Sequence, residues 1–74
     1  MKKYEEVMQR IINLIHQGSL RKEDRLPSIR SMARQMNIST MTVLEGYIQL
    51  ERLGLIQSRP QSGFYVIAEE PYSS

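Results

Sequence analysis

Two helical patterns joined by a very short connection constrain this fold more than any other feature of the sequence. The first pattern spaces apolar side chains along one face of a helix, at Ile29, Met32, Ala33 and Met36. Asn37 tolerates the left-handed conformation that ends many helices, and Ser39 is suited to cap a second helix that runs to about Leu53. Two helices joined by so tight a turn predict a helix-turn-helix.

Both helices carry further start and stop signals. Pro27 disfavours a helical conformation at Leu26, and Ser28 can accept a hydrogen bond from a free backbone N–H of the first helix. Gly54 is a typical residue to end the second helix. The second helix begins with polar residues and has an expected inward face made of Val43, Gly46, Tyr47, Leu50 and Leu53.

A third amphipathic helix is predicted ahead of this pair. Gly18 supplies its stop signal. Leu14 lies off its apolar face, and we expect the C-terminal hairpin to cover it. The apolar stripe of this helix consists of Tyr4, Val7, Met8, Ile11, Ile12 and Ile15.

The last part of the chain changes from a helical to a strand pattern. Residues 55–59 and 64–67 predict two strands, and the Pro-Gln-Ser-Gly sequence at 60–63 has turn chemistry. Three helices followed by a hairpin, or wing, predict a mainly α winged helix-turn-helix over residues 1–68. Residues 69–74 are acidic and then Pro-Tyr-Ser-Ser, which predicts the start of a linker or a disordered tail.

Length and composition exclude several classes of protein. A chain of 74 residues is one small domain, and with no cysteine it has no disulfide or thiolate metal site. The apolar runs are far shorter than a membrane span, and acids stand where a signal peptide would be apolar, so we expect a soluble, cytoplasmic protein. His16, the only histidine, has no acid or nucleophile spaced to work with it, and no phosphate-binding loop or metal-ligand cluster is present. We therefore expect no enzyme and no cofactor in this chain.

The distribution of charge favours a polyanionic partner. The formal net charge is +2, and two of the acids that oppose it, Glu69 and Glu70, lie in the tail. In the middle of the chain only Glu23 and Asp24 oppose a group of five basic residues, Arg21, Lys22, Arg25, Arg30 and Arg34.

Several segments together resemble the GntR family of bacterial transcription regulators. Residues 18–20 and 26–33 are similar to the signature around the second helix of that family. Residues 39–43, Tyr47 and residues 50–56 are similar to its recognition helix and the entry to its wing. The resemblance implies a domain that binds double-stranded DNA. It also implies a homodimer in the full-length protein, while the isolated domain is expected to be monomeric or weakly paired.

The wing, residues 59–66, most resembles the MocR branch of the family. That resemblance implies a C-terminal domain, absent from this chain, that is similar to a pyridoxal-phosphate aminotransferase. The short YtrA-like regulators are the alternative. Three positions depart from the family pattern: Lys22-Glu23 replaces Pro-Gly, Thr40 and Leu44 replace arginines, and Gly46 replaces an alanine at a cost of about 1 kcal/mol in helix propensity.

The motif predicts which residues meet DNA. The start of the third helix, with its free N–H groups and positive dipole end, is expected in the major groove, and the wing at the adjacent backbone or minor groove. Without the arginines, Thr40, Met41 and Leu44 favour A·T pairs through hydroxyl and thymine-methyl contacts. The expected DNA-binding residues are Arg30, Arg34, Ser39, Thr40, Met41, Thr42, Leu44, Arg59, Gln61, Ser62 and Gly63.

Several of these assignments have a structural alternative. Ser39 is favoured as a plain helix cap, and Arg30 can form a surface ion pair. Met41 and Leu44 form a second apolar stripe with Ile48 that can pack against the hairpin. A winged helix that contacts only proteins is the alternative function, although it would not need arginines on one surface.

Overall fold

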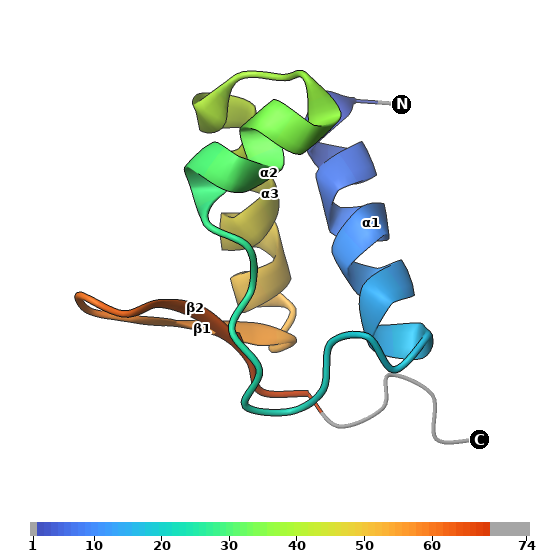
Figure 1. Ribbon diagram of the computed structural model, residues 1–74, viewed down its shortest axis with the longest axis vertical. Helices are drawn as coiled ribbons and strands as arrows, with labels where there is room; N and C mark the ends of the chain where they lie inside the picture. Colours follow the sequence, from blue (N-terminus) through green and yellow to red (C-terminus); the bar gives the residue numbers. More distant parts are fainter. Residues whose placement is uncertain (1, 69–74) are drawn as a thin grey trace.

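Three helices and a two-stranded antiparallel hairpin make up the computed structural model, which describes residues 2–68. The helices are α1 (Lys3–His16), α2 (Ile29–Met36) and α3 (Thr40–Arg52), and the strands are β1 (Ile56–Arg59) and β2 (Gly63–Val66). Figure 1 shows α1 and α3 side by side, with the hairpin projecting away from the helices. The predicted winged helix-turn-helix is confirmed, and the predicted tail at 69–74 lies outside the described residues.

The helix ends form where the sequence predicts them. Ser28 Oγ accepts a hydrogen bond from the Ser31 N–H at 3.0 Å, which caps α2. Asn37 ends α2 in the left-handed conformation, with φ 58°. Ser39 Oγ accepts from the Thr42 N–H at 3.2 Å and caps α3. Because Asn37 and Ser39 both lie within three residues of Met36, the last residue of α2, the chain must change direction sharply between the two helices.

Tyr47 of α3 is at the centre of the core. Its ring is fully buried and meets Phe64 of β2 edge to face, with ring centroids 5.1 Å apart. Its hydroxyl donates a hydrogen bond to the Pro27 carbonyl at 2.7 Å. Burial raises the pKa of the Tyr47 phenol above its usual value of 10.0, so the phenol stays protonated and remains a donor. The other fully buried large side chains are Val7, Ile11, Met32, Val43, Leu50, Ile56 and Val66.

Gly46 allows α1 and α3 to approach closely. A Cβ atom at this position would lie 2.9 Å from Val7 Cβ and 3.0 Å from the Tyr4 carbonyl oxygen. Both distances are shorter than an ordinary van der Waals contact, so an alanine would force the two helices apart. Close packing against α1 therefore explains why a glycine, despite its poor helix propensity, stands in the middle of α3. The sequence did not reveal this reason.

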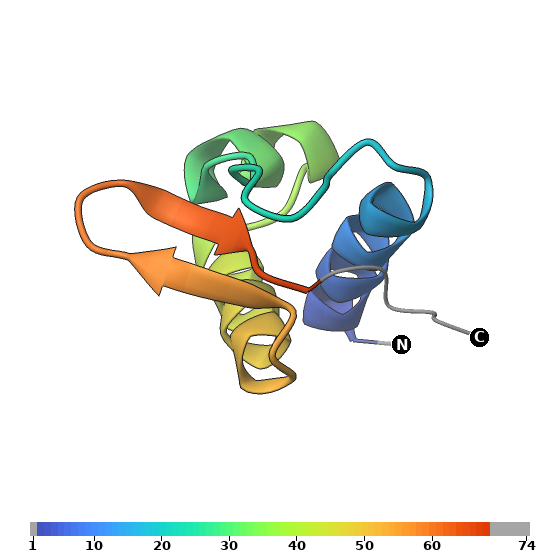
Figure 2. The same ribbon diagram turned by 90° about the horizontal axis from the view of Figure 1, so that it is seen from below.

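A third extended segment pairs with the wing, which the sequence did not predict. The Leu26 N–H donates to the Phe64 carbonyl at 2.8 Å, and the Val66 N–H donates to the Asp24 carbonyl at 2.9 Å. Arg25 thus lies opposite Tyr65 in an antiparallel bridge. Figure 2 shows this segment, β2 and β1 lying side by side in that order.

The turn before this segment holds a non-glycine residue in the left-handed region. The Asp24 N–H donates to the Arg21 carbonyl at 2.9 Å, and Glu23 has φ 77°. This is the geometry that Pro-Gly would adopt most easily, because glycine favours a positive φ at the third turn position. The turn nevertheless forms with Lys22-Glu23, and the Glu23 N–H donates to the Val66 carbonyl at 2.8 Å.

Three details differ from the sequence-based expectations. Leu53 is 62% exposed because the chain reverses at Gly54, so that Ile56 fills the core instead. The hairpin was expected to cover Leu14, but Leu14 lines a surface depression together with Met36 of α2, and no hairpin residue lines that depression. The first strand is one residue shorter than the predicted 55–59, because it begins at Ile56. The second strand, Gly63–Val66, is shifted by one residue from the predicted 64–67. Within residues 2–68, no helix is long and apolar enough to cross a membrane.

Replacing Gly46 with alanine is expected to lower the free energy of unfolding. Overpacking costs about 1–3 kcal/mol, which exceeds or cancels the gain of about 1 kcal/mol in helix propensity. Urea unfolding of the Gly46→Ala variant measures the change. The matched control is the neighbouring exposed position, where Glu45→Ala is expected to be about 1 kcal/mol more stable than Glu45→Gly. A stabilised Gly46→Ala variant would contradict the close approach.

Replacing Tyr47 with phenylalanine is expected to destabilise the fold by about 1–3 kcal/mol, because the Pro27 carbonyl loses its donor. The variant also tests the raised pKa of Tyr47. Above pH 10.0 an unfolded tyrosine ionises while the buried phenol stays protonated, so stability falls as pH rises. Unfolding curves between neutral and alkaline pH should show a smaller loss in Tyr47→Phe than in the unmodified protein. Equal losses would mean that the phenol ionises normally.

Candidate nucleic-acid interface

The first turn of α3 presents free backbone donors to solvent. Ser39 is the cap, and its Oγ also lies 2.8 Å from Thr42 Oγ1, so both predicted hydroxyls are engaged with each other. Within residues 2–68, the N–H groups of Thr40 and Met41 have no hydrogen-bond partner. Thr40 is exposed, and Met41 is 72% exposed. This turn can therefore accept an anion and also present two side chains to a partner.

The second apolar stripe of α3 is open and does not pack against the hairpin. Met41, the half-buried Leu44 and Ile48 line a shallow surface depression together with Thr42, Glu45 and Gln49. The hairpin contributes no residue to this depression. The stripe is available for an apolar contact such as a thymine methyl group.

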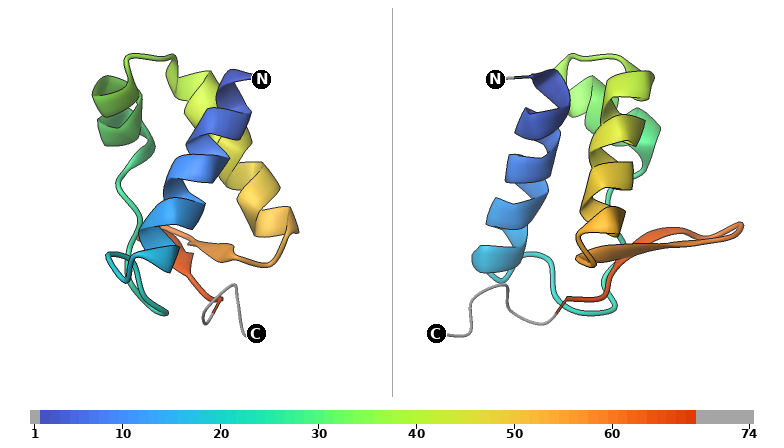
Figure 3. Two further views of the ribbon diagram at one scale, coloured as in Figure 1. Left: turned by 90° about the vertical axis from the view of Figure 1, so that its right-hand side faces the viewer. Right: turned by 180° about the vertical axis from the view of Figure 1, so that it is seen from behind.

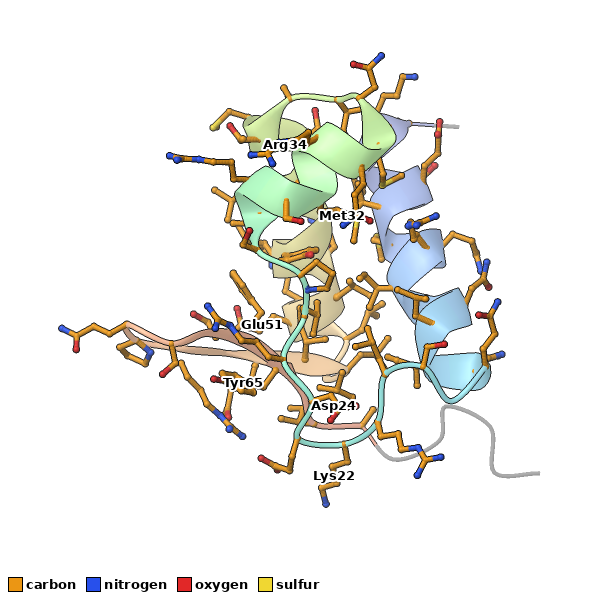
Figure 4. All side chains as sticks on the ribbon, in the orientation of Figure 1. Lys22, Asp24, Met32, Arg34, Glu51 and Tyr65 are labelled. Carbon is orange, nitrogen blue, oxygen red and sulfur yellow. The ribbon has the colours of Figure 1, made fainter. Side chains whose placement is uncertain are left out.

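Arg30 and Arg34 lie one turn apart on α2, and both are exposed. In the part of the chain that the structure describes, neither guanidinium forms an ion pair or a hydrogen bond. The surface ion pair that was the alternative for Arg30 is therefore not found there. Figure 4 shows Arg34 at the end of the molecule where α3 begins.

Arg59 of β1 is held within the wing. Its Nη2 donates to Glu23 Oε1 at 2.9 Å, and its Nε donates to Gln57 Oε1 at 3.2 Å. The guanidinium lies over the Tyr65 ring, 4.4 Å from the centroid. Arg59, one of the predicted DNA-binding residues, thus has three partners: Glu23, Gln57 and the Tyr65 ring.

The wing tip contains the remaining predicted residues. Gln61 and Ser62 are exposed, and the Ser62 N–H donates to the Arg59 carbonyl at 3.0 Å, which closes the turn. Gly63 has φ 120°, and a Cβ atom there would lie only 3.2 Å from Arg25 Nε. Glycine at this position therefore makes room for the Arg25 side chain as well as for the turn.

A carboxylate of α3 contributes to the placement of the wing. Glu51 Oε2 accepts a hydrogen bond from the Ser58 N–H at 3.1 Å, which joins the last turn of α3 to β1. Figure 4 shows Glu51 between α3 and the hairpin. Figure 3 shows that the hairpin projects on the side of the molecule where α2 and α3 begin. The starts of α2 and α3 and the hairpin thus lie on one side of the fold.

The sequence did not identify Glu23, Arg25 and Tyr65 as part of this region. They meet only because the segment before α2 pairs with β2. A signal was present, since a turn at Lys22-Glu23 followed by Pro27 leaves an extended segment between them.

Comparison with known proteins gives one consistent family. Residues 3–66 match the family described as "Bacterial regulatory proteins, gntR family". The chain is 42% identical over 66 residues to the HTH-type transcriptional regulator YdcR of Escherichia coli (strain K12). It is 37% identical over 67 residues to the HTH-type transcriptional regulator YcxD of Bacillus subtilis (strain 168).

These alignments cover most of this chain but little of the relatives. They include 89% and 90% of this chain, which spans only 14% of YdcR and 15% of YcxD. Among solved structures, the AraR DNA-binding domain in complex with operator ORR3 superposes with a TM-score of 0.86 at 26% identity. That match covers 89% of this chain and 80% of the AraR chain. Because the family match extends over nearly all the described residues and the fold agrees, this chain belongs to the gntR family of bacterial regulatory proteins.

Proposed function

We propose that this domain binds double-stranded DNA sequence-specifically, as the reading head of a bacterial transcription regulator. The observation that carries the proposal is that Arg30 and Arg34, both exposed on α2, have no ion pair or hydrogen bond within residues 2–68, where the first turn of α3 also has free N–H groups. Unpaired exposed cations with free backbone donors are suited to phosphates. The AraR domain, which shares this fold, was crystallised with its operator.

In the proposed complex α3 lies in the major groove. Arg30 and Arg34 bind phosphates from α2, while the N–H groups of Thr40 and Met41 bind another at the positive end of the helix dipole. Thr40, Met41 and Leu44 then meet base edges, with Ser39 and Thr42 holding the first turn in shape. Since no arginine projects from this turn, the domain is proposed to favour A·T pairs through methyl contacts.

The wing is proposed to lie at the adjacent backbone or minor groove. Gln61, Ser62 and Gly63 form an exposed tip that can approach the groove closely. Arg59 is proposed as the phosphate ligand of β1, and the ion pair with Glu23 balances part of its charge. The hydrogen bond between Glu51 and Ser58 supports a defined angle between the wing and α3.

We further propose that the domain, residues 1–68, precedes a linker beginning at 69–74 and belongs to a longer cytoplasmic regulator of the MocR branch. The much greater length of YdcR and YcxD supports this reading over the short YtrA-like architecture. Any pyridoxal phosphate would then bind to the other domain, and this chain would bind no cofactor and catalyse no reaction. The intact protein would be a homodimer, and sedimentation would show this chain alone as a monomer or weak dimer.

Replacing Arg30 with alanine is expected to weaken binding to every duplex. Loss of one phosphate contact makes the dependence of log affinity on log salt shallower by about 0.9. Fluorescence anisotropy with a labelled mixed-sequence duplex, from about 50 mM salt upward, measures both quantities. Arg10→Ala is the matched control, because it removes an equal charge from the exposed side of α1. A folded protein that binds no duplex would favour the alternative, a winged helix that contacts only proteins.

Removing thymine methyl groups from a selected operator is expected to weaken DNA binding, because the Met41 side chain loses its contact with a methyl group. Each buried methyl contributes about 0.8 kcal/mol, so uracil in place of a contacted thymine should reduce affinity roughly fourfold. In the Met41→Ala variant the same replacement should have little effect, because the contact is already lost. Equal sensitivity of both proteins to uracil would place the methyl contact on another residue.

A further inference from the structure

We propose that Arg25 supplies the phosphate contact of the wing and that Glu23 keeps Arg59 from doing so. This inference rests on the proposed DNA binding and reassigns the basic residue within it. It concerns the outward face of the three-segment sheet, formed by the 24–26 segment, β2 and β1.

The pairing register places these side chains on one face. Tyr65 lies opposite Gln57 of β1 and opposite Arg25 of the neighbouring segment. Arg59 lies opposite Gly63, two residues from Tyr65. Because alternate residues of a strand share a face, this face carries two guanidinium groups, and their surroundings differ.

Arg59 is committed to contacts inside the wing. It stacks on Tyr65 at 4.4 Å and donates to Glu23 at 2.9 Å. The ion pair leaves the Arg59 side chain only 37% exposed and balances its charge locally. A phosphate bound to Arg59 would lie close to the Glu23 carboxylate, and like charges repel.

Arg25 is free of such contacts. The residue is exposed, and its guanidinium extends beside Gly63, toward the wing tip, where the absence of a Cβ leaves room for it. Within residues 2–68 its side chain has no hydrogen bond and no carboxylate partner. The two nearest acids in the sequence are engaged elsewhere, Glu23 by Arg59 and Asp24 by the Arg21 N–H at 2.8 Å.

The backbone conformation of Glu23 also supports this inference. Glu23 has φ 77°, a conformation that disfavours a residue with a Cβ and favours glycine. Glu23 keeps this unfavourable backbone conformation, and its carboxylate pairs with Arg59, which lies 36 residues further along the chain. A glycine at this position would relieve the backbone and release Arg59 in one change, which makes the arrangement testable without weakening the fold.

The experiment compares the salt dependence of duplex binding for five proteins by fluorescence anisotropy. These are the unmodified chain, Arg25→Ala, Arg59→Ala, Glu23→Gly and the Glu23→Gly/Arg59→Ala double variant. Arg10→Ala again controls for loss of one positive charge, and thermal unfolding by circular dichroism confirms that each protein is folded.

The expected result is a slope shallower by about one unit for Arg25→Ala and an unchanged slope for Arg59→Ala. Glu23→Gly should bind more tightly with a slope steeper by about one unit, and the double variant should lose that gain. A shallower slope for Arg59→Ala together with an unchanged slope for Arg25→Ala would overturn the inference while DNA binding itself stands. An unmodified chain that binds no duplex would instead overturn the proposed function, and this inference with it.

Discussion

The hydrogen bond from the buried Tyr47 hydroxyl to the Pro27 carbonyl is the interaction on which the arrangement of the interface depends. It joins the middle of α3 to the segment that enters α2, while the Tyr47 ring contacts Phe64 at the base of the wing. The three elements that are proposed to face DNA thus meet at one side chain. A shift of this residue would move the arginines of α2 and the wing relative to the first turn of α3.

Local signals account for what the sequence predicted well. The caps at Ser28 and Ser39, the left-handed end at Asn37 and the apolar face of α3 each depend on residues within a few positions of one another. Such signals can be read from neighbouring residues alone. Leu53 was placed wrongly because helical periodicity continues through the sequence, whereas the chain itself reverses at Gly54.

The features that the sequence did not reveal all depend on residues far apart in the chain. Nothing near Gly46 indicates that Val7 and Tyr4 will press against it. The pairing of residues 24–26 with β2 and the ion pair between Glu23 and Arg59 likewise exist only after the hairpin folds back. For the candidate site, the sequence could not tell that the Arg59 guanidinium is paired with Glu23 whereas Arg30 and Arg34 have no such partner within residues 2–68.

The two edges of the wing are occupied to different extents. On one side the 24–26 segment occupies the N–H and carbonyl groups of β2, and on the other the Glu51 carboxylate takes the Ser58 N–H of β1. An unpaired strand edge is a template on which another chain can add a strand and begin to aggregate. The pairing of β2 with the 24–26 segment removes one such edge, so within the described residues the outer edge of β1 is the place where another chain could still add a strand.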